Sequence, residues 1–106
     1  MKLSLEQSDD FWADLIRHVD WYREQAAPEV AEQFVEAVEG TLEDLTQTPG
    51  MGRRRFMDRP KLAEIRSFRV KRPFNRLLIF YRYDSQTLYA ERLIHGARDL
   101  PRRLLL

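Results

Sequence analysis

The 106-residue chain has no cysteine, only four glycines and five prolines, and no long hydrophobic run. The absence of cysteine excludes disulfide bonds, thiolate zinc sites and a cysteine nucleophile. The longest apolar run covers residues 77–81, far short of the about 20 residues that a membrane-spanning helix needs. The first ten residues lack the apolar segment of a secretion signal. These absences predict a cytoplasmic protein without a membrane partner, and the length predicts a single domain over residues 1–106.

Charge is distributed unevenly, although the formal net charge is only +1. Residues 1–50 contain 3 lysines and arginines against 12 aspartates and glutamates, a net charge of −9. Residues 51–106 contain 15 against 5, a net charge of +10. Residues 65–82 contain no acidic side chain at all. Because a solvated face normally mixes both signs, this segregation favours a basic surface that binds an acidic partner.

The first half of the chain has the pattern of a short strand followed by two helices. Residues 2–6 alternate between polar and apolar side chains, which predicts a half-buried strand. Ser8 can accept a free backbone N–H, so it predicts the start of a helix that runs to about Gln25 and leaves Asp14 outside its apolar stripe. That stripe comprises Phe11, Trp12, Leu15, Ile16, Val19 and Tyr22. Pro28 opens a second amphipathic helix, and the short link between the helices predicts an antiparallel hairpin.

The second half of the chain has the pattern of a sheet. Residues 53–60 have no usable period and are predicted to form a basic loop. Strands are predicted within 65–70, 76–84 and 87–95, with a tight turn between the last two. The prediction is therefore an α+β fold: an N-terminal strand and an antiparallel helical hairpin packed on a curved antiparallel sheet of three to four strands.

Four segments in this order resemble the RelE/ParE toxin superfamily, and its ParE-like branch in particular. They are residues 49–53 (PGMGR), 65–70 (IRSFRV), 78–82 (LIFYR) and 93–100 (LIHGARDL). The resemblance implies the toxin of a type II toxin–antitoxin pair, neutralised by a cognate antitoxin. It further implies that a ParE-like member inhibits DNA gyrase, whereas a RelE-like member would cut messenger RNA on the ribosome.

Catalytic chemistry is not evident in the sequence. RNA cleavage without a metal would need a general base and a general acid, and the resemblance implies that RelE-like ribonucleases carry a tyrosine near the chain end. Here the last tyrosine, Tyr89, lies inside a predicted strand. His95 is the remaining acid–base candidate but is better explained as a structural histidine, and a metal pair of Asp14 with His18 lacks further ligands. We predict no catalytic residue, metal or cofactor and a gyrase inhibitor without catalysis; a RelE-like mRNA interferase is the alternative.

Two groups of residues are predicted to bind partners. Arginines of the strands and their ends are predicted to bind an acidic arm of the antitoxin, which would also supply an apolar helix. They are Arg66, Arg69, Arg76, Arg82 and Arg92. The resemblance implies that the C-terminal segment attacks gyrase, which gives a predicted target-binding set. It comprises His95, Arg98, Asp99, Arg102 and Arg103. Direct sequence-specific binding of nucleic acid is not predicted.

Overall fold

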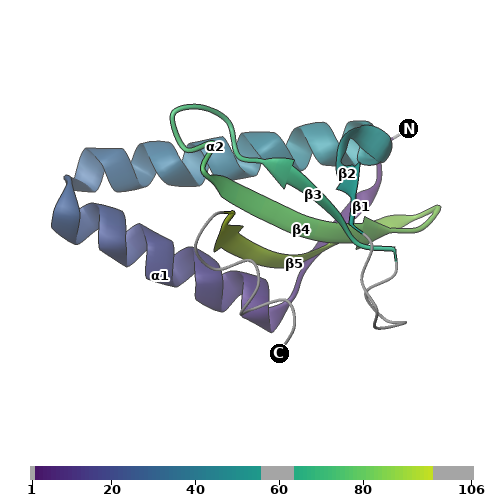
Figure 1. The fold of residues 1–106 in the computed structure, drawn as a ribbon, viewed down its shortest axis with the longest axis horizontal. Coiled ribbons are helices and arrows are strands. Elements are labelled where there is room, and N and C mark those ends of the chain that lie inside the picture. Colours follow the sequence, from purple (N-terminus) through teal and green to yellow (C-terminus); the bar gives the residue numbers. More distant parts are fainter. Residues whose placement is uncertain (1, 56–63, 97–106) are drawn as a thin grey trace.

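A computed structural model describes residues 2–55 and 64–96 of the chain, and the account below is confined to these residues. A strand comes first, two helices follow, and the remaining strands complete a sheet (Figure 1). The elements are β1 (Ser4–Gln7), α1 (Asp9–Gln25), α2 (Pro28–Gln47), the short 3-10 helix η1 (Pro49–Met51), β2 (Arg53–Arg54), β3 (Arg66–Arg69), β4 (Leu77–Tyr83) and β5 (Thr87–His95). The predicted α+β class, with its N-terminal strand and its helical hairpin on a sheet, is confirmed.

The sheet has five strands in the order β1-β5-β4-β3-β2, rather than the predicted three to four. The additional strand is β2, Arg53–Arg54, which lies inside the segment predicted to be a loop. Two arginines are too short a run to show an apolar alternation. The sheet is also mixed, because β1 pairs in parallel with β5 while the other neighbours are antiparallel. The chain between β1 and β5 contains the helical hairpin and the three other strands, so it is long enough for the crossover that a parallel pair requires.

The first strand starts later and is more exposed than predicted. Leu3 donates its N–H to the carbonyl of Thr46 in α2, so pairing with β5 begins only at Ser4. As an edge strand, β1 has one paired side, and the side chain of Leu5 is 39% exposed.

Both helices begin where the sequence predicts. The Ser8 hydroxyl accepts from the N–H of Phe11 at 3.0 Å, and α2 begins at Pro28. The buried side of α1 differs from the predicted stripe, because α1 lies along β5 rather than over the middle of the sheet (Figure 1). Trp12 is 47% and Ile16 58% exposed, whereas Asp14 is only 2% exposed.

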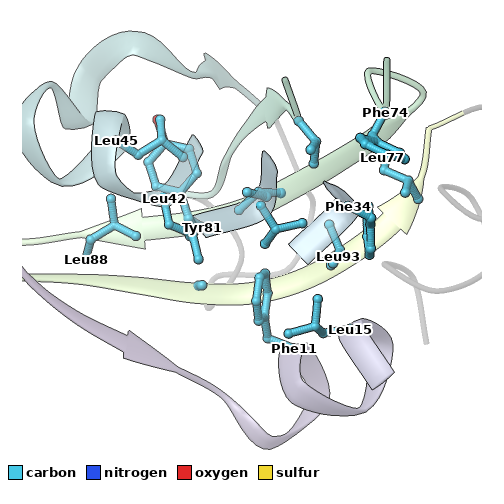
Figure 2. Close-up of a cluster of buried hydrophobic side chains, with 14 residues drawn as sticks. Phe11, Leu15, Phe34, Leu42, Leu45, Phe74, Leu77, Tyr81, Leu88 and Leu93 are labelled. Carbon is cyan, nitrogen blue, oxygen red and sulfur yellow. The ribbon is translucent and has the colours of Figure 1, made fainter. Parts of the chain in front are cut away.

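The main core lies between the helical hairpin and one face of the sheet (Figure 2). Phe34 and Leu45 of α2 are fully buried there against strand residues such as Tyr81 and Leu93. Alternation along the strands turns a second set of apolar side chains to the opposite face. This smaller cluster consists of Ile65, Leu78, Phe80 and Ile94.

Candidate functional site

Arginines gather on the sheet face that points away from the helices. The pairing register places Arg53 opposite Ser67 and Arg69 opposite Leu78, so both share the face of Leu78. Arg82 follows Tyr81, which points into the main core, and therefore points to the same outer face. The term basic face is used below for Arg53, Arg55, Arg69 and Arg82.

Arg55 shows how closely these charges crowd. Its Nε donates to the Ser67 hydroxyl at 2.7 Å, and its guanidinium lies 5.8 Å from the centroid of the Phe80 ring. Burial, followed by the positive charges of Arg53 and Arg69, lowers the pKa of Arg55. A bound anion would relieve this repulsion, so the basic face suits phosphate or carboxylate groups, which arginine binds with two parallel hydrogen bonds.

Arg82 is held in place at the other side of the basic face. Its guanidinium lies 4.1 Å from the centroid of the Tyr89 ring, and its Nε donates to Glu91 at 3.2 Å. Tyr89 in turn donates to a carboxylate oxygen of Asp84 at 3.3 Å. The contacts with Tyr89 and Glu91 orient the guanidinium of Arg82, and the carboxylate of Glu91 partly balances its charge.

Side chains of α1 and its N-cap bind the edge of β5 beyond the end of β1. The Ser8 hydroxyl donates to the carbonyl of Glu91, and an oxygen of Asp14 accepts the N–H of Leu93 at 2.9 Å. His18 Nε2 lies 3.0 Å from the carbonyl oxygen of Leu93. Asp14 and His18, considered above as a metal pair, are thus bonded to the backbone of one strand, and no group of three possible metal ligands occurs among residues 2–55 and 64–96.

A buried tyrosine fixes the segment that leads into β2. The Tyr81 hydroxyl accepts from the N–H of Gly52 at 2.8 Å and donates to the carbonyl of Pro49 at 2.7 Å. Burial raises the pKa of Tyr81, so the hydroxyl stays protonated and keeps both hydrogen bonds near neutral pH. A structural role accounts for this tyrosine.

Comparison with known proteins identifies the family. The chain matches the ParE toxin of the type II toxin–antitoxin system, parDE, over residues 5–100. This chain belongs to the ParE toxin family.

Two solved structures show that this ParE-family chain has the fold of its relatives. One is described as a chromosomal ParDE toxin–antitoxin system from P. aeruginosa; it is 21% identical, with a TM-score of 0.70, and the match covers 89% of this chain and 96% of the other. The toxin–antitoxin complex RelBE2 from Mycobacterium tuberculosis is 20% identical, with a TM-score of 0.56, covering 90% and 99% respectively. Comparison with curated proteins gave no match. In the part of the chain that the structure describes, neither helix is long and apolar enough to span a membrane.

The structure separates the arginines predicted to bind an antitoxin. Arg69, whose Nη1 donates to the Asn75 carbonyl at 3.1 Å, shares the basic face with Arg82. Arg66 points to the other face and donates to the Gly52 carbonyl at 2.9 Å, and Arg92 is paired with Asp14. Arg76 is exposed in the turn before β4.

The basic face also contains two arginines of this ParE-family chain that we did not predict as site residues. Arg53 and Arg55 fall in the segment predicted to be a loop, although their run of three arginines was a usable signal. The predicted binding role of Arg69 and Arg82 stays a prediction.

Of the residues predicted to contact the target, one lies within the described part of the chain. His95 is half-buried at the end of β5, where it pairs with Leu77. The other four are outside the described residues: Arg98, Asp99, Arg102 and Arg103.

Proposed function

We propose that this ParE-family toxin inhibits DNA gyrase in the cytoplasm without catalysis of its own and is neutralised by a cognate antitoxin. The observation that carries the proposal is the crowding of Arg53, Arg55 and Arg69 on the sheet face away from the helices. Gyrase works on DNA, and a cationic face next to bound DNA gains affinity from the phosphate backbone without reading its sequence.

Three of the described side chains that could do acid–base work are consistent with the proposal of no catalysis. The Tyr81 hydroxyl is buried in two backbone hydrogen bonds, and the His18 ring lies against the Leu93 carbonyl. Glu91 is paired with Arg82. These groups are engaged in structure, whereas a general base must be within reach of the proton that it removes.

The basic face also supports the proposed mode of neutralisation. The two similar solved structures are both described as toxin–antitoxin systems. An acidic arm of an antitoxin would pair with Arg69 and Arg82, and it would occupy the same face that we propose lies towards DNA-bound gyrase. Neutralisation then follows from competition for one surface, because the two anionic partners cannot bind there together.

The test is induced expression without the antitoxin, with parallel labelling of DNA and protein synthesis at early times. We expect DNA synthesis to stop first and the purified toxin to inhibit supercoiling by gyrase. If protein synthesis stops first and messages are cut on ribosomes, the mRNA interferase alternative is correct instead. No effect on growth or on gyrase would contradict both.

A matched pair of double variants tests the basic face itself. Arg53→Ala with Arg69→Ala removes two of its charges, while Arg23→Ala with Lys71→Ala removes two exposed charges that pair with Asp20 and Asp44 on the helices. Only the first pair is expected to weaken inhibition of gyrase. Equal inhibition by both double variants would show that the basic face does not serve the target.

A further inference from the structure

Helix α2 carries a row of glutamates along its exposed side. They are Glu29, Glu32, Glu36, Glu39 and Glu43, spaced alternately by three and four residues. This spacing places all five on one side of the helix. Glu43 pairs with Lys2 at 2.8 Å, but among residues 2–55 and 64–96 no cation pairs with the other four.

Like charges at this spacing repel one another and destabilise the helix that carries them. A surface helix normally alternates the two signs, so an unbalanced row points to a partner that supplies the positive charge. The row begins in the first turn of α2, where a carboxylate is favourable, but continues for four turns, well past the reach of the helix dipole.

A groove with apolar and polar lining runs beside this row, and Glu32, Glu36, Glu39 and Glu43 border it together with Lys2 and Arg23. Its larger part has a volume of about 500 Å³ and is bordered by β1, the start of α1 and α2, with Trp12, Leu15 and Val35 among its lining residues. A second part of about 360 Å³ continues between the two helices, lined by Val19, Ala31 and again Val35. Val35 lines both parts, so they adjoin along α2.

Large apolar side chains are exposed at the larger part of the groove. Trp12 lines it and is 47% exposed, and Ile16, one turn further along α1, is 58% exposed. Leu5 of β1, another lining residue, is 39% exposed. A surface that carries apolar side chains beside a row of charges is complementary to an amphipathic helix, which has an apolar side and a charged side.

We propose that this groove docks an amphipathic α-helix of a partner protein, whose apolar stripe contacts Trp12 and Val35 and whose lysines or arginines pair with Glu32, Glu36 and Glu39. The row from Glu29 to Glu43 spans about 21 Å, which corresponds to a partner helix of about 14 residues. The proposal goes beyond the inhibition of gyrase. It assigns a second surface, opposite in charge to the basic face and on the other side of the molecule.

The charge of the groove selects its occupant. An acidic chain fits the basic face but would be repelled by the glutamate row, so the two surfaces take segments of opposite charge. A helix that docks here would relieve the repulsion along α2 and would bury Trp12 and Leu5 at the same time.

The test measures binding of two designed helical peptides of about 16 residues to the full chain. Both peptides carry the same leucine stripe, flanked by lysines in one and by glutamates in the other. In a Trp21→Phe variant the remaining tryptophan, Trp12, lines the groove and reports docking by its fluorescence, whereas Trp21 in a Trp12→Phe variant should report little. We expect the lysine peptide to bind at least about tenfold more tightly than the glutamate peptide, with the preference shrinking as salt rises.

Matched neutral variants locate the site. Glu32→Gln with Glu39→Gln should lower the affinity for the lysine peptide by about tenfold. Asp10→Asn with Glu24→Gln removes the same charge from exposed positions of α1 and should change this affinity by no more than about twofold. Equal binding of the two peptides, no binding of either, or equal loss in both variants would overturn the proposal. So would self-association of the free chain that the groove variants abolish, because the occupant would then be a second copy. None of these outcomes depends on whether gyrase is the target.

Discussion

Asp14 of α1 and Arg92 of β5 form a two-point ion pair at the edge of the sheet. Arg92 Nε lies 2.7 Å from Oδ2 of Asp14, and Arg92 Nη2 lies 3.0 Å from Oδ1. Oδ2 also accepts the N–H of Leu93, so one carboxylate replaces the strand partner that β1 no longer provides at this position. The pair connects the acidic helical half of the chain to the basic sheet half.

Replacement of Asp14 by alanine should destabilise the fold strongly. It would remove a buried carboxylate that accepts from the guanidinium of Arg92 and from the N–H of Leu93, and we expect a loss of about 3 kcal/mol in the free energy of unfolding. Urea denaturation measures the loss. The control is Asp20→Ala, which breaks the exposed pair with Arg23 and should cost less than about 1 kcal/mol. Similar losses in the two variants would show that the buried pair contributes no more than a surface pair.

Gly52→Ala should be costly because its new Cβ would overlap the Tyr81 hydroxyl. We expect about 1–3 kcal/mol of destabilisation from this overpacking, seen as a lower midpoint of thermal or urea unfolding. Gly50→Ala is the control, since a Cβ there would lie 3.7 Å from the nearest atom, the Tyr83 hydroxyl oxygen. A Gly52→Ala variant as stable as Gly50→Ala would mean that Tyr81 can move aside without losing its hydrogen bonds.

Stability in acid should depend on Asp84. The N–H groups of Gln86 and Thr87, each 2.8 Å from Oδ1, hold the pKa of Asp84 below its ordinary value of 3.8. Because the folded state binds this proton less readily than the unfolded chain, the stabilisation is present above about pH 4 and is lost as pH falls through the lowered pKa. Asp84→Ser keeps a hydroxyl acceptor but does not titrate, so its unfolding free energy should change less between pH 5 and pH 2.5 than that of the wild type. If the unfolding free energies of the variant and the wild type changed equally with pH, Asp84 would not be the source of the stability lost in acid.

The predicted arginines should separate into two groups when each is tested against an antitoxin. Arg69→Ala with Arg82→Ala should weaken the complex by about tenfold at low salt and reduce its dependence on salt, because both side chains lie on the basic face. Arg66→Ala should instead lower the stability of the free toxin, since Arg66 donates to the Gly52 carbonyl. Calorimetric titration and thermal unfolding distinguish the two effects. If Arg66→Ala weakened binding as much as the double variant at unchanged stability, the separation by face would be wrong.

The local features of the fold were predictable from sequence because their causes lie within a few residues. Ser8 caps α1 through the N–H of Phe11, and Pro28 opens α2, whatever the rest of the chain does. The strong apolar run of β4 and the turn before β5 belong to the same class, since periodicity and turn chemistry are local properties.

The features that sequence reasoning missed depend on partners far along the chain. Asp14 is buried because Arg92, 78 residues away, meets it, and no helical pattern around Asp14 announces this. With Asp14 turned inwards on α1, Trp12 is turned to solvent, although its spacing suits the apolar stripe. Likewise Arg53 and Arg54 form a strand only because Ser67 and Arg66 present a free edge to them.

The candidate site was predictable only in part. The excess of arginine between residues 65 and 82 correctly indicated a charged sheet, but the choice of face requires the register, which depends on strand pairing. Arg66 and Arg69 lie three residues apart on β3, so alternation alone places them on opposite faces. Which of the two shares a face with Arg82 on β4 depends on the pairing of these strands.

The parallel pairing of β1 with β5 has a consequence for synthesis on the ribosome. Ser4 pairs with Thr87, so β1, the earliest strand to be translated, has no neighbour until the latest of the described strands has emerged. The acidic helices can form a hairpin in the nascent chain, but β5 occupies a place between β1 and β4 and is needed before the sheet can close. The five-stranded sheet is therefore completed last, and with it the contact of Arg82 with Glu91 of β5 that orients one arginine of the basic face.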